Sequence, residues 1–511
     1  MKNFLKLLTL VMTLLMLVSC FVACGGTTET ETENNETETS TETEVETKNL
    51  DAYGREVVED GIPTDVNYSN RTDNVITFFT RSDSVIHAIE MDADELIEET
   101  LNDAIYRRNV TVEERLGVTI TQISQPGCYG PHTEWLQTLR NAVNTKSGDF
   151  DAAAVYASQG SPLAIEGMYY DVNNLDQIDL EKPWWNKAVV KDLELFDNIF
   201  FLSGGLAISQ ITESGAVYYN KGLFEKYHSG LSLYDLVDSK EWTIDMLYDL
   251  SSSVWEDANL SGVIDDGDTV GYVGWAHDRK KGWMDAWIAA MDIYITEKNS
   301  DGIPELVMYS ERTVDAFEKI QKLHRQNAGG LTKNGLVATA FINDNILFET
   351  KALREGETLR DMASPYGVVP FPLYNEEQDG YFVYPQNGCS LITVVSTLAE
   401  DRKEMMGYTI ELMAAESYRQ VTPEYYSVVL KSKYSAEADD ARMFDIIIEG
   451  IRIDFGFVYA STMLGSPNNL FREIDRDFAS EYDSFESTYL TKLETLIDAL
   501  DDLSFKLEQG E

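Results

Sequence analysis

Cysteine, histidine and basic residues are scarce in this sequence. It has 4 Cys and 5 His among 511 residues, and no Cys/His cluster with the spacing of a catalytic zinc site. Its 40 Lys and Arg stand against 88 Asp and Glu, which gives a formal net charge of −48. This charge argues against nucleic-acid phosphates as partners, because they demand basic patches. An HExxH motif, a nucleophile elbow and a phosphate-binding loop are also absent.

A long apolar run occurs only near the N-terminus. Lys2 and Lys6 give a basic start, and residues 5–22 are apolar without an acidic side chain. Small residues and a cysteine follow, which predicts a lipoprotein signal peptide ending at Cys24, whose thiol would be lipidated. Cys20 is the alternative lipidation site. A transmembrane anchor is a further alternative, but the run is near the short end of the ~17–25 residues that a span needs.

The next segment is of low complexity and strongly acidic. Residues 27–47 alternate Thr and Glu and lack aromatic side chains, so we expect a disordered tether over 25–70. The roughly 440 residues that remain are too many for one ordinary core, which predicts two lobes. The two other cysteines, Cys128 and Cys389, either form one disulfide or remain as free thiols, and the sequence leaves both open.

Polar residues follow two predicted strands in the first half of the chain. Residues 75–80 are apolar and β-branched, and residues 152–156 form a second short apolar run. In open α/β sheets, ligands collect at the carboxyl ends of the strands. This placement marks four candidate ligand-binding residues, Arg81, Ser82, Ser158 and Gln159. The alternative for each of them is an ordinary polar loop residue.

The segment from Phe201 to Tyr227 combines strand and helix signals. Apolar residues within 206–211 suggest an imperfect strand, and 216–219 is a short β-prone run. Asn220 then stands where its side chain can cap a helix over 222–227.

This segment also resembles a known signature. The stretch AVYYNKGLFEKY is similar to the "YNK.LFEK.G" pattern of the bacterial extracellular solute-binding proteins of ABC importers, the family-1 sugar-binding type. Further stretches resemble that family in the same order along residues 75–415, among them RRNVTVEERLGVTI, EWTIDMLYDL and YGVVPFP. The return strand within 338–348 matches only in part, since Asn-Asp replaces the expected Gly-Lys.

The resemblance implies a fold and a function. The fold would be α/β, two-lobed and periplasmic-binding-protein-like (type II), with a hinge and an interlobe cleft. By resemblance the ligand is a carbohydrate, expected to be an oligosaccharide. The protein would deliver it to the membrane subunits of an ABC permease without acting as an enzyme. The implied boundaries are 71–217 and 343–396 for lobe 1, 218–342 and 397–511 for lobe 2, and hinge crossings at 217–219 and near 343 and 396.

Four further residues are candidates for the cleft. Glu213 and Asn387 lie beside the expected hinge crossings, and Trp275 and Trp283 could stack on a sugar ring. Core packing is the alternative for both tryptophans. For the pair Trp184-Trp185 and for Trp287, packing is the preferred interpretation.

Residues 257–268 have the spacing of a calcium loop. Oxygen-bearing side chains stand at positions 1, 3, 5, 9 and 12 of this twelve-residue loop, Gly262 stands at the sharp turn, and Ile264 occupies the apolar position. The expected ligands are Asp257, Asn259, Ser261, the carbonyl of Val263, Asp265 and Asp268. Ser261 replaces a carboxylate and Asp268 replaces the usual Glu, so the alternatives are a structural calcium site and an Asp/Gly-rich turn.

Two other functions remain alternatives. An extracellular glycoside hydrolase needs two carboxylates about 5–10 Å apart across a cleft, and Glu213 has no evident partner in the sequence. A surface carbohydrate-binding lipoprotein without a transport role agrees with the lipid tether. Turnover of oligosaccharides would indicate the enzyme, whereas ligand-dependent stabilisation without products would indicate a binding protein.

Overall fold

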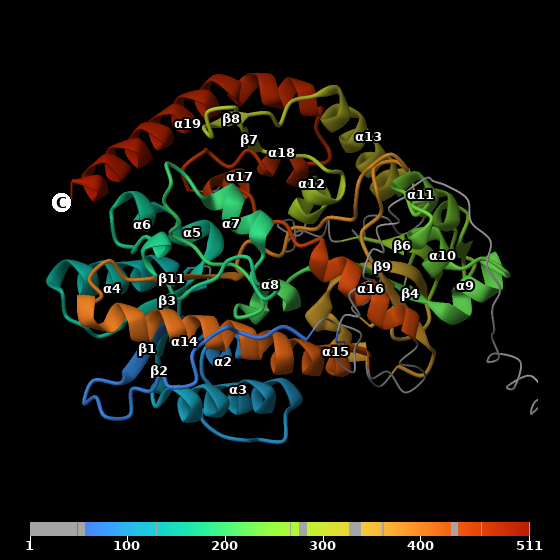
Figure 1. Ribbon diagram of the computed structural model, residues 1–511. Helices are drawn as coiled ribbons and strands as arrows, with labels where there is room; N and C mark the ends of the chain where they lie inside the picture. The colour runs from blue at the N-terminus through green and yellow to red at the C-terminus, as the bar shows by residue number, and fades with distance from the viewer. Residues whose placement is uncertain are drawn as a thin grey trace, which may run out of the picture. The chain divides into compact units, whose positions relative to one another are not determined.

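The structure is a computed structural model of residues 1–511 (Figure 1). It describes residues 49, 57–128, 130–265, 267–274, 284–326, 339–359, 362–430, 438–460 and 462–509. Residues 1–57 and 58–511 form separate units, and the fold below is that of the second unit. The signal peptide, Cys20, Cys24 and most of the predicted tether lie outside the described residues.

The folded unit begins earlier than the sequence predicts. Asp60 is buried, and its carboxylate pairs with Arg115 at 2.8 Å and with Arg419 at 3.1 Å. Ile62 packs in a hydrophobic core cluster. Residues 58–70 therefore belong to the folded body rather than to the predicted tether over 25–70, because they supply both an apolar anchor and a buried ion pair.

The first sheet has four strands in the order β11-β3-β1-β2. Strand β1 pairs in parallel with β2 and β3, and β11 pairs antiparallel with β3. Gly117 ends the helix that leads into β2, with φ +67°, a left-handed conformation that glycine adopts without strain. The strands are β1 (Val75–Arg81), β2 (Thr119–Gln125), β3 (Ala152–Tyr156) and β11 (Ser390–Val394).

The second sheet has five strands in the order β10-β4-β9-β6-β5. Strand β9 pairs antiparallel with β4 and in parallel with β6. Asn220 follows β4, and its side chain accepts a hydrogen bond from the backbone N–H of Leu223, as the sequence predicts. The strands are β4 (Gly215–Asn220), β5 (Trp255–Glu256), β6 (Thr269–Val273), β9 (Ile346–Ala352) and β10 (Tyr366–Val369).

The lobe boundaries drawn from the sequence do not follow the sheets. Residues 343–396 were expected in lobe 1, but β9 and β10 belong to the second sheet and only β11 belongs to the first. The C-terminal range 397–511 was expected in lobe 2. Its helix α14 (Lys403–Glu416) instead packs against α3 (Thr100–Leu116) of the first lobe, where Figure 1 shows the orange and blue helices near each other. Met406 on α14 shares a hydrophobic cluster with strand β1, so apolar packing fixes this placement.

The strand expected within 206–211 is a short helix, α8 (Ile208–Thr212). Ile208 and Ile211 are both buried, and their spacing of three residues fits a helix rather than a strand. The Ser209 backbone N–H also donates to Glu90 Oε1 at 2.8 Å, which holds the first turn in place.

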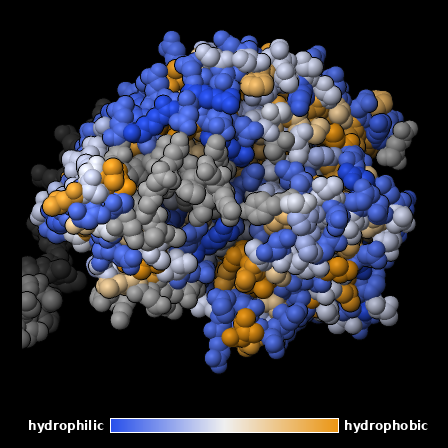
Figure 2. All heavy atoms as spheres, turned by 180° about the vertical axis from the view of Figure 1, so that it is seen from behind, coloured by the Kyte–Doolittle hydropathy of each residue, from blue (hydrophilic) through white to orange (hydrophobic). Residues whose placement is uncertain are grey.

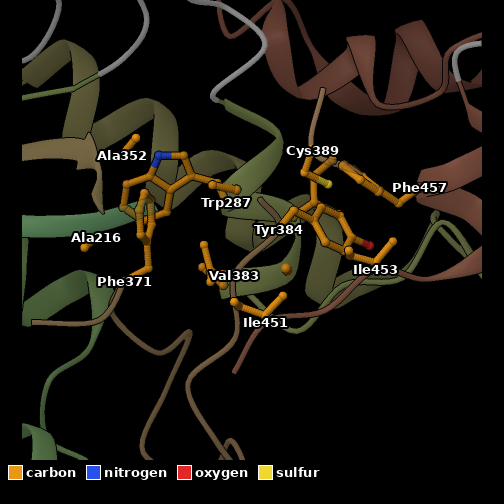
Figure 3. Packing of buried hydrophobic residues seen from close by; sticks show 14 of the residues in the cluster. Ala216, Trp287, Ala352, Phe371, Val383, Tyr384, Cys389, Ile451, Ile453 and Phe457 are labelled. Carbon is orange, nitrogen blue, oxygen red and sulfur yellow. The ribbon is translucent and has the colours of Figure 1, made fainter. Parts of the chain in front are cut away.

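Helices cover both sheets, and two short strands form a separate antiparallel pair, β7-β8. A large core cluster includes Trp287, Phe371, Tyr384 and Phe457 (Figure 3), and Trp287 is fully buried, as predicted for a core residue. The remaining elements are α2 (Val85–Ile89), α4 (His132–Thr145), α5 (Ala157–Gly160), α6 (Pro162–Ile165), η1 (Val172–Asn174), α7 (Lys187–Leu193), α9 (Lys221–His228), α10 (Leu233–Asp238), α11 (Ile244–Ser252), α12 (Ala286–Ala290), β7 (Thr296–Lys298), β8 (Pro304–Leu306), α13 (Glu311–Gln326), η3 (Leu353–Leu359), η4 (Glu400–Arg402), η5 (Ser417–Val421), α15 (Thr422–Leu430), α16 (Ala438–Glu449), α17 (Phe455–Ala460), α18 (Asn469–Arg472) and α19 (Phe478–Glu508).

The surface agrees with the acidic composition. Figure 2 shows one face on which hydrophilic residues predominate and hydrophobic ones form separate small groups. Within the described parts of the chain, no helix combines the length and the apolar character needed to cross a bilayer.

Candidate functional site

A pocket of about 350 Å³, counting space open to solvent, lies where connections of both sheets meet. Asp83 and Ser84 follow β1, and Tyr156 ends β3, so the first sheet contributes the carboxyl ends of two neighbouring strands. Arg354 follows β9 of the second sheet. The full lining is Asp83, Ser84, His87, Cys128, Tyr156, Glu213, Arg354, Gln386 and Gly388.

Glu213 is the predicted ligand residue that lines this pocket. It follows α8, its side chain is 2 % exposed, and Oε1 forms an ion pair with the Arg354 guanidinium. Among the described residues, Glu213 Oε2 has no hydrogen-bond partner. Burial raises the pKa of this carboxyl to about 7, although Arg354 and Arg81 act in the opposite direction. Glu213 is therefore a buried acid with one oxygen paired and the other without a hydrogen-bond partner among the described residues.

Arg81 lies behind the pocket rather than in its lining. Its guanidinium is buried and donates to the Gly388 carbonyl and to Ser390 Oγ, both at 2.6 Å. The guanidinium carbon also lies 5.3 Å from the centre of the Tyr156 ring. Arg81 thus fixes the loop that precedes β11, and through it the position of pocket residues.

Glu90 is a buried acid near the pocket that the sequence did not single out. Its carboxylate accepts hydrogen bonds from Ser390 Oγ and from the Ser209 backbone N–H. It therefore ties the start of β11 to helix α8, directly before Glu213. The sequence carried no signal for this role, because Glu90 ends a short helix in an acidic stretch.

His87 and Cys128 complete one wall of the pocket. His87 Nδ1 lies 2.8 Å from Ser84 Oγ and 3.7 Å from Cys128 Sγ. Burial, with help from the charges of Arg81 and Arg354, lowers the pKa of His87 to about 2, so the imidazole is neutral. Burial also raises the pKa of the Cys128 thiol. Cys128 and Cys389 are both free, which settles the question that the sequence left open.

The other predicted ligand residues lie near the pocket or outside the described residues. Asn387 stands between two lining residues, and its Oδ1 lies 3.5 Å from the Tyr156 hydroxyl. Ser82 is exposed next to Asp83, Ser158 is buried, and Gln159 is half-buried on α5, and none of them belongs to the lining. Trp275 and Trp283 lie outside the described residues.

The predicted calcium loop is closed by its own hydrogen bonds. Asp257 Oδ2 accepts from the Gly262 N–H at 2.7 Å, and Gly262 has φ +75°, as the turn position requires. Ser261 Oγ donates to the Val263 carbonyl at 2.9 Å, and Asp268 Oδ1 accepts from the Ala258 N–H at 2.9 Å. Across the described residues, no group of three or more His, Cys, Asp or Glu is arranged for a metal ion. A calcium site that also uses Asn259, Ser261 and a carbonyl stays a prediction.

Solved structures share this architecture at low sequence identity. An extracellular solute-binding protein from Staphylococcus aureus in complex with maltose is 12% identical with a TM-score of 0.54, over 83% of this chain and 99% of that one. A cyclo/maltodextrin-binding protein complexed with maltotetraose is 12% identical with a TM-score of 0.51, over 85% and 98%. A family 1 extracellular solute-binding protein from Bifidobacterium longum subsp. infantis is 13% identical with a TM-score of 0.50, over 82% and 99%.

These likenesses establish the fold. They extend over most of this chain and nearly all of each neighbour, so the chain has the two-lobed α/β fold of the extracellular solute-binding proteins, as the sequence predicts. No family model matches the sequence, and no curated protein matches it.

Proposed function

We propose that this chain, given its solute-binding fold, is the lipid-anchored, extracytoplasmic binding component of an ABC transporter. It binds a carbohydrate in the pocket around Glu213 and delivers it unchanged to the membrane permease. The observation that carries the proposal is the pocket itself, which is built from connections of both sheets in a fold shared with proteins solved with maltose and maltotetraose.

The chemistry of the pocket suits a hydroxylated ligand. Glu213 Oε2 offers an acceptor without a competing partner among the described residues, and the neutral His87 and the Gln386 amide add polar groups to the wall. Buried polar groups of this kind favour a ligand that supplies hydrogen bonds and disfavour one that cannot. Because the lining comes from both sheets, bending at the crossings between them would open and close the pocket around the solute.

A panel of oligosaccharides in a thermal-shift assay tests this function. We expect at least one glycan to raise the melting temperature in a concentration-dependent manner, because a ligand that binds only the folded state stabilises it. The glycan should be recovered intact after long incubation. Absence of stabilisation by every glycan, at concentrations where other solutes do stabilise the protein, would contradict the proposal.

The same incubation separates binding from hydrolysis. Asp83 lines the pocket together with Glu213, so a pair of carboxylates is present. Asp83 Oδ2, however, accepts the backbone N–H groups of Gly127 and Cys128, which gives this acid a role in holding the loop. Shorter products that disappear in Glu213→Gln would favour a glycoside hydrolase over a transport protein.

The anchor and the calcium loop have direct tests. Labelling with a fatty-acid analogue should be lost in Cys24→Ala and kept in Cys20→Ala. Loss only in Cys20→Ala would assign the lipid to Cys20.

For the predicted calcium loop, calcium should raise the melting temperature of the wild-type protein but not of Asp257→Asn, since a carboxylate ligand is removed. Equal behaviour of both proteins with calcium and with a chelator would rule out the ion.

A further inference from the structure

The arrangement of charges around the pocket points to a ligand more specific than a neutral sugar. Resting on the proposed function, we propose that Glu213 selects a carbohydrate that bears a positively charged amino group. The ammonium would donate to Glu213 Oε2 while Arg354 keeps its contact with Oε1.

The first argument is the balance of charges. Three carboxylates, Asp83, Glu90 and Glu213, stand in or directly behind the pocket, against the two guanidinium groups of Arg81 and Arg354. The two terminal nitrogens of Arg81 donate to the Gly388 carbonyl and to the Ser390 hydroxyl, so these donors are already engaged behind the pocket. The site therefore holds more acid than base, and a cationic ligand improves that balance.

The second argument is the incomplete pairing of Glu213. A carboxylate can accept several hydrogen bonds, yet among the described residues Oε2 receives none, although Glu213 is only 2 % exposed. Leaving a buried charged oxygen without a donor is costly, and a charge-assisted hydrogen bond is the strongest way to satisfy it. The raised pKa of this carboxyl shows that Arg354 does not offset the burial.

The third argument is what the remaining walls lack. His87 is neutral because burial lowers its pKa to about 2, so it adds no positive charge that would repel an ammonium group. Cys128 is a thiol whose pKa burial raises, and the Ser84 hydroxyl is engaged with His87. Arg354 is 32 % exposed at its side chain, so solvent screens part of its repulsion of a second cation while it keeps its contact with Oε1.

The experiment compares a glucose trisaccharide with two others. In each of these, one substituent of every ring is changed, to an amine in one trimer and to a carboxylate in the other. Binding of glucosamine, glucose and uronic acid trimers is measured by calorimetry at about pH 7. The wild-type protein is compared with Glu213→Gln, which keeps the shape and removes the charge. The matched control is Asp192→Asn, because Asp192 is another carboxyl whose pKa burial raises, to about 6, but it does not line the pocket.

We expect the amino trimer to bind the wild-type protein and Asp192→Asn at least about tenfold more tightly than the glucose trimer, the range of one charge-assisted hydrogen bond. In Glu213→Gln this advantage should fall to within about threefold. An equal or tighter fit of the glucose or uronic acid trimer would overturn the inference and leave the proposed function standing. An advantage that persists in Glu213→Gln would overturn it as well. Failure of all three trimers and of the wider glycan panel would overturn the proposed function itself.

Discussion

Two buried glutamates of this protein have nearly the same burial and different surroundings. Glu411 is 1 % exposed and Glu213 is 2 % exposed, and burial raises the pKa of each carboxyl to about 7. Glu411 accepts the indole N–H of Trp184 at 3.0 Å on Oε1 and that of Trp185 at 2.9 Å on Oε2. Glu213 has one paired oxygen and one without a partner among the described residues.

This difference in hydrogen bonding distinguishes an acid with a structural role from one that can bind a ligand. Both glutamates bear the same cost of burial, so burial and pKa alone do not tell the two roles apart. What distinguishes them is the completeness of the hydrogen bonds. Glu411 is satisfied inside the protein and holds the tryptophan pair to α14, whereas Glu213 keeps one oxygen for a group that is not part of the chain.

The largest effect is expected from Glu411→Ala. This change leaves two buried indole N–H groups without an acceptor and opens a cavity beside them, so we expect a loss of about 3–5 kcal/mol in the free energy of unfolding. Urea denaturation followed by tryptophan fluorescence measures it. Glu411→Gln should lose less, because its amide oxygen still accepts one indole. A loss below about 1 kcal/mol for Glu411→Ala would remove the distinction between the two acids.

The second effect is the dependence of folding stability on pH. The pKa of the Glu213 carboxyl rises from 4.5 to about 7 in the folded protein. The folded state therefore holds this proton to a higher pH than the unfolded state does, and stability that is fully present below pH 4.5 is lost as the pH rises to about 7. Arg354, Arg81, Glu90 and Glu355 face this carboxyl, and the two arginines reduce the rise without cancelling it.

Glu213→Gln should flatten this part of the stability profile. Between about pH 5 and about pH 8, the change in unfolding free energy should be smaller in the variant by about 2–3 kcal/mol, at about 1.4 kcal/mol per pKa unit. Urea denaturation at a series of pH values gives the profile. A variant profile parallel to that of the wild-type protein, whatever its offset, would mean that Glu213 does not titrate in this range.

The sequence predicted local structure well and the assembly of the site poorly. The cap at Asn220 depends on neighbouring residues, and it is present. The predicted packing role of Trp184 and Trp185 also agrees with their burial. The strand expected at 206–211 is a helix, because its apolar spacing was ambiguous over so short a run.

The pocket was only partly visible in the sequence for a physical reason. Glu213 was found because it lies beside a motif that marks a crossing between sheets. His87, Cys128 and Arg354 belong to three segments that come together only in the folded chain, and none of them carries a spacing that indicates a site. The range 343–396 was assigned to one lobe for a similar reason, because the pairing of β9 and β10 with β4 is a long-range contact that the sequence does not show.

The smallest effect is expected in the alkylation rates of the two thiols, one of which lines the pocket while the other lies in the core. Cys128 lines the pocket at 6 % exposure, whereas Cys389 is 0 % exposed and lies in the core cluster with Tyr384 and Phe457 (Figure 3). Alkylation requires the thiolate and access, so native Cys128 should react slowly and Cys389 more slowly still.

A ligand in the pocket should then protect one thiol and leave the other unchanged. At a ligand concentration of about ten times Kd, the free protein is reduced about tenfold, and the alkylation rate of Cys128 should fall by the same factor. Peptide mapping by mass spectrometry follows each cysteine separately, and Cys128→Ser identifies the background from Cys389. A glycan that raises the melting temperature while Cys128 reacts at its original rate would bind outside this pocket. The difference between Glu213 and Glu411 in hydrogen bonding would then say nothing about the binding site.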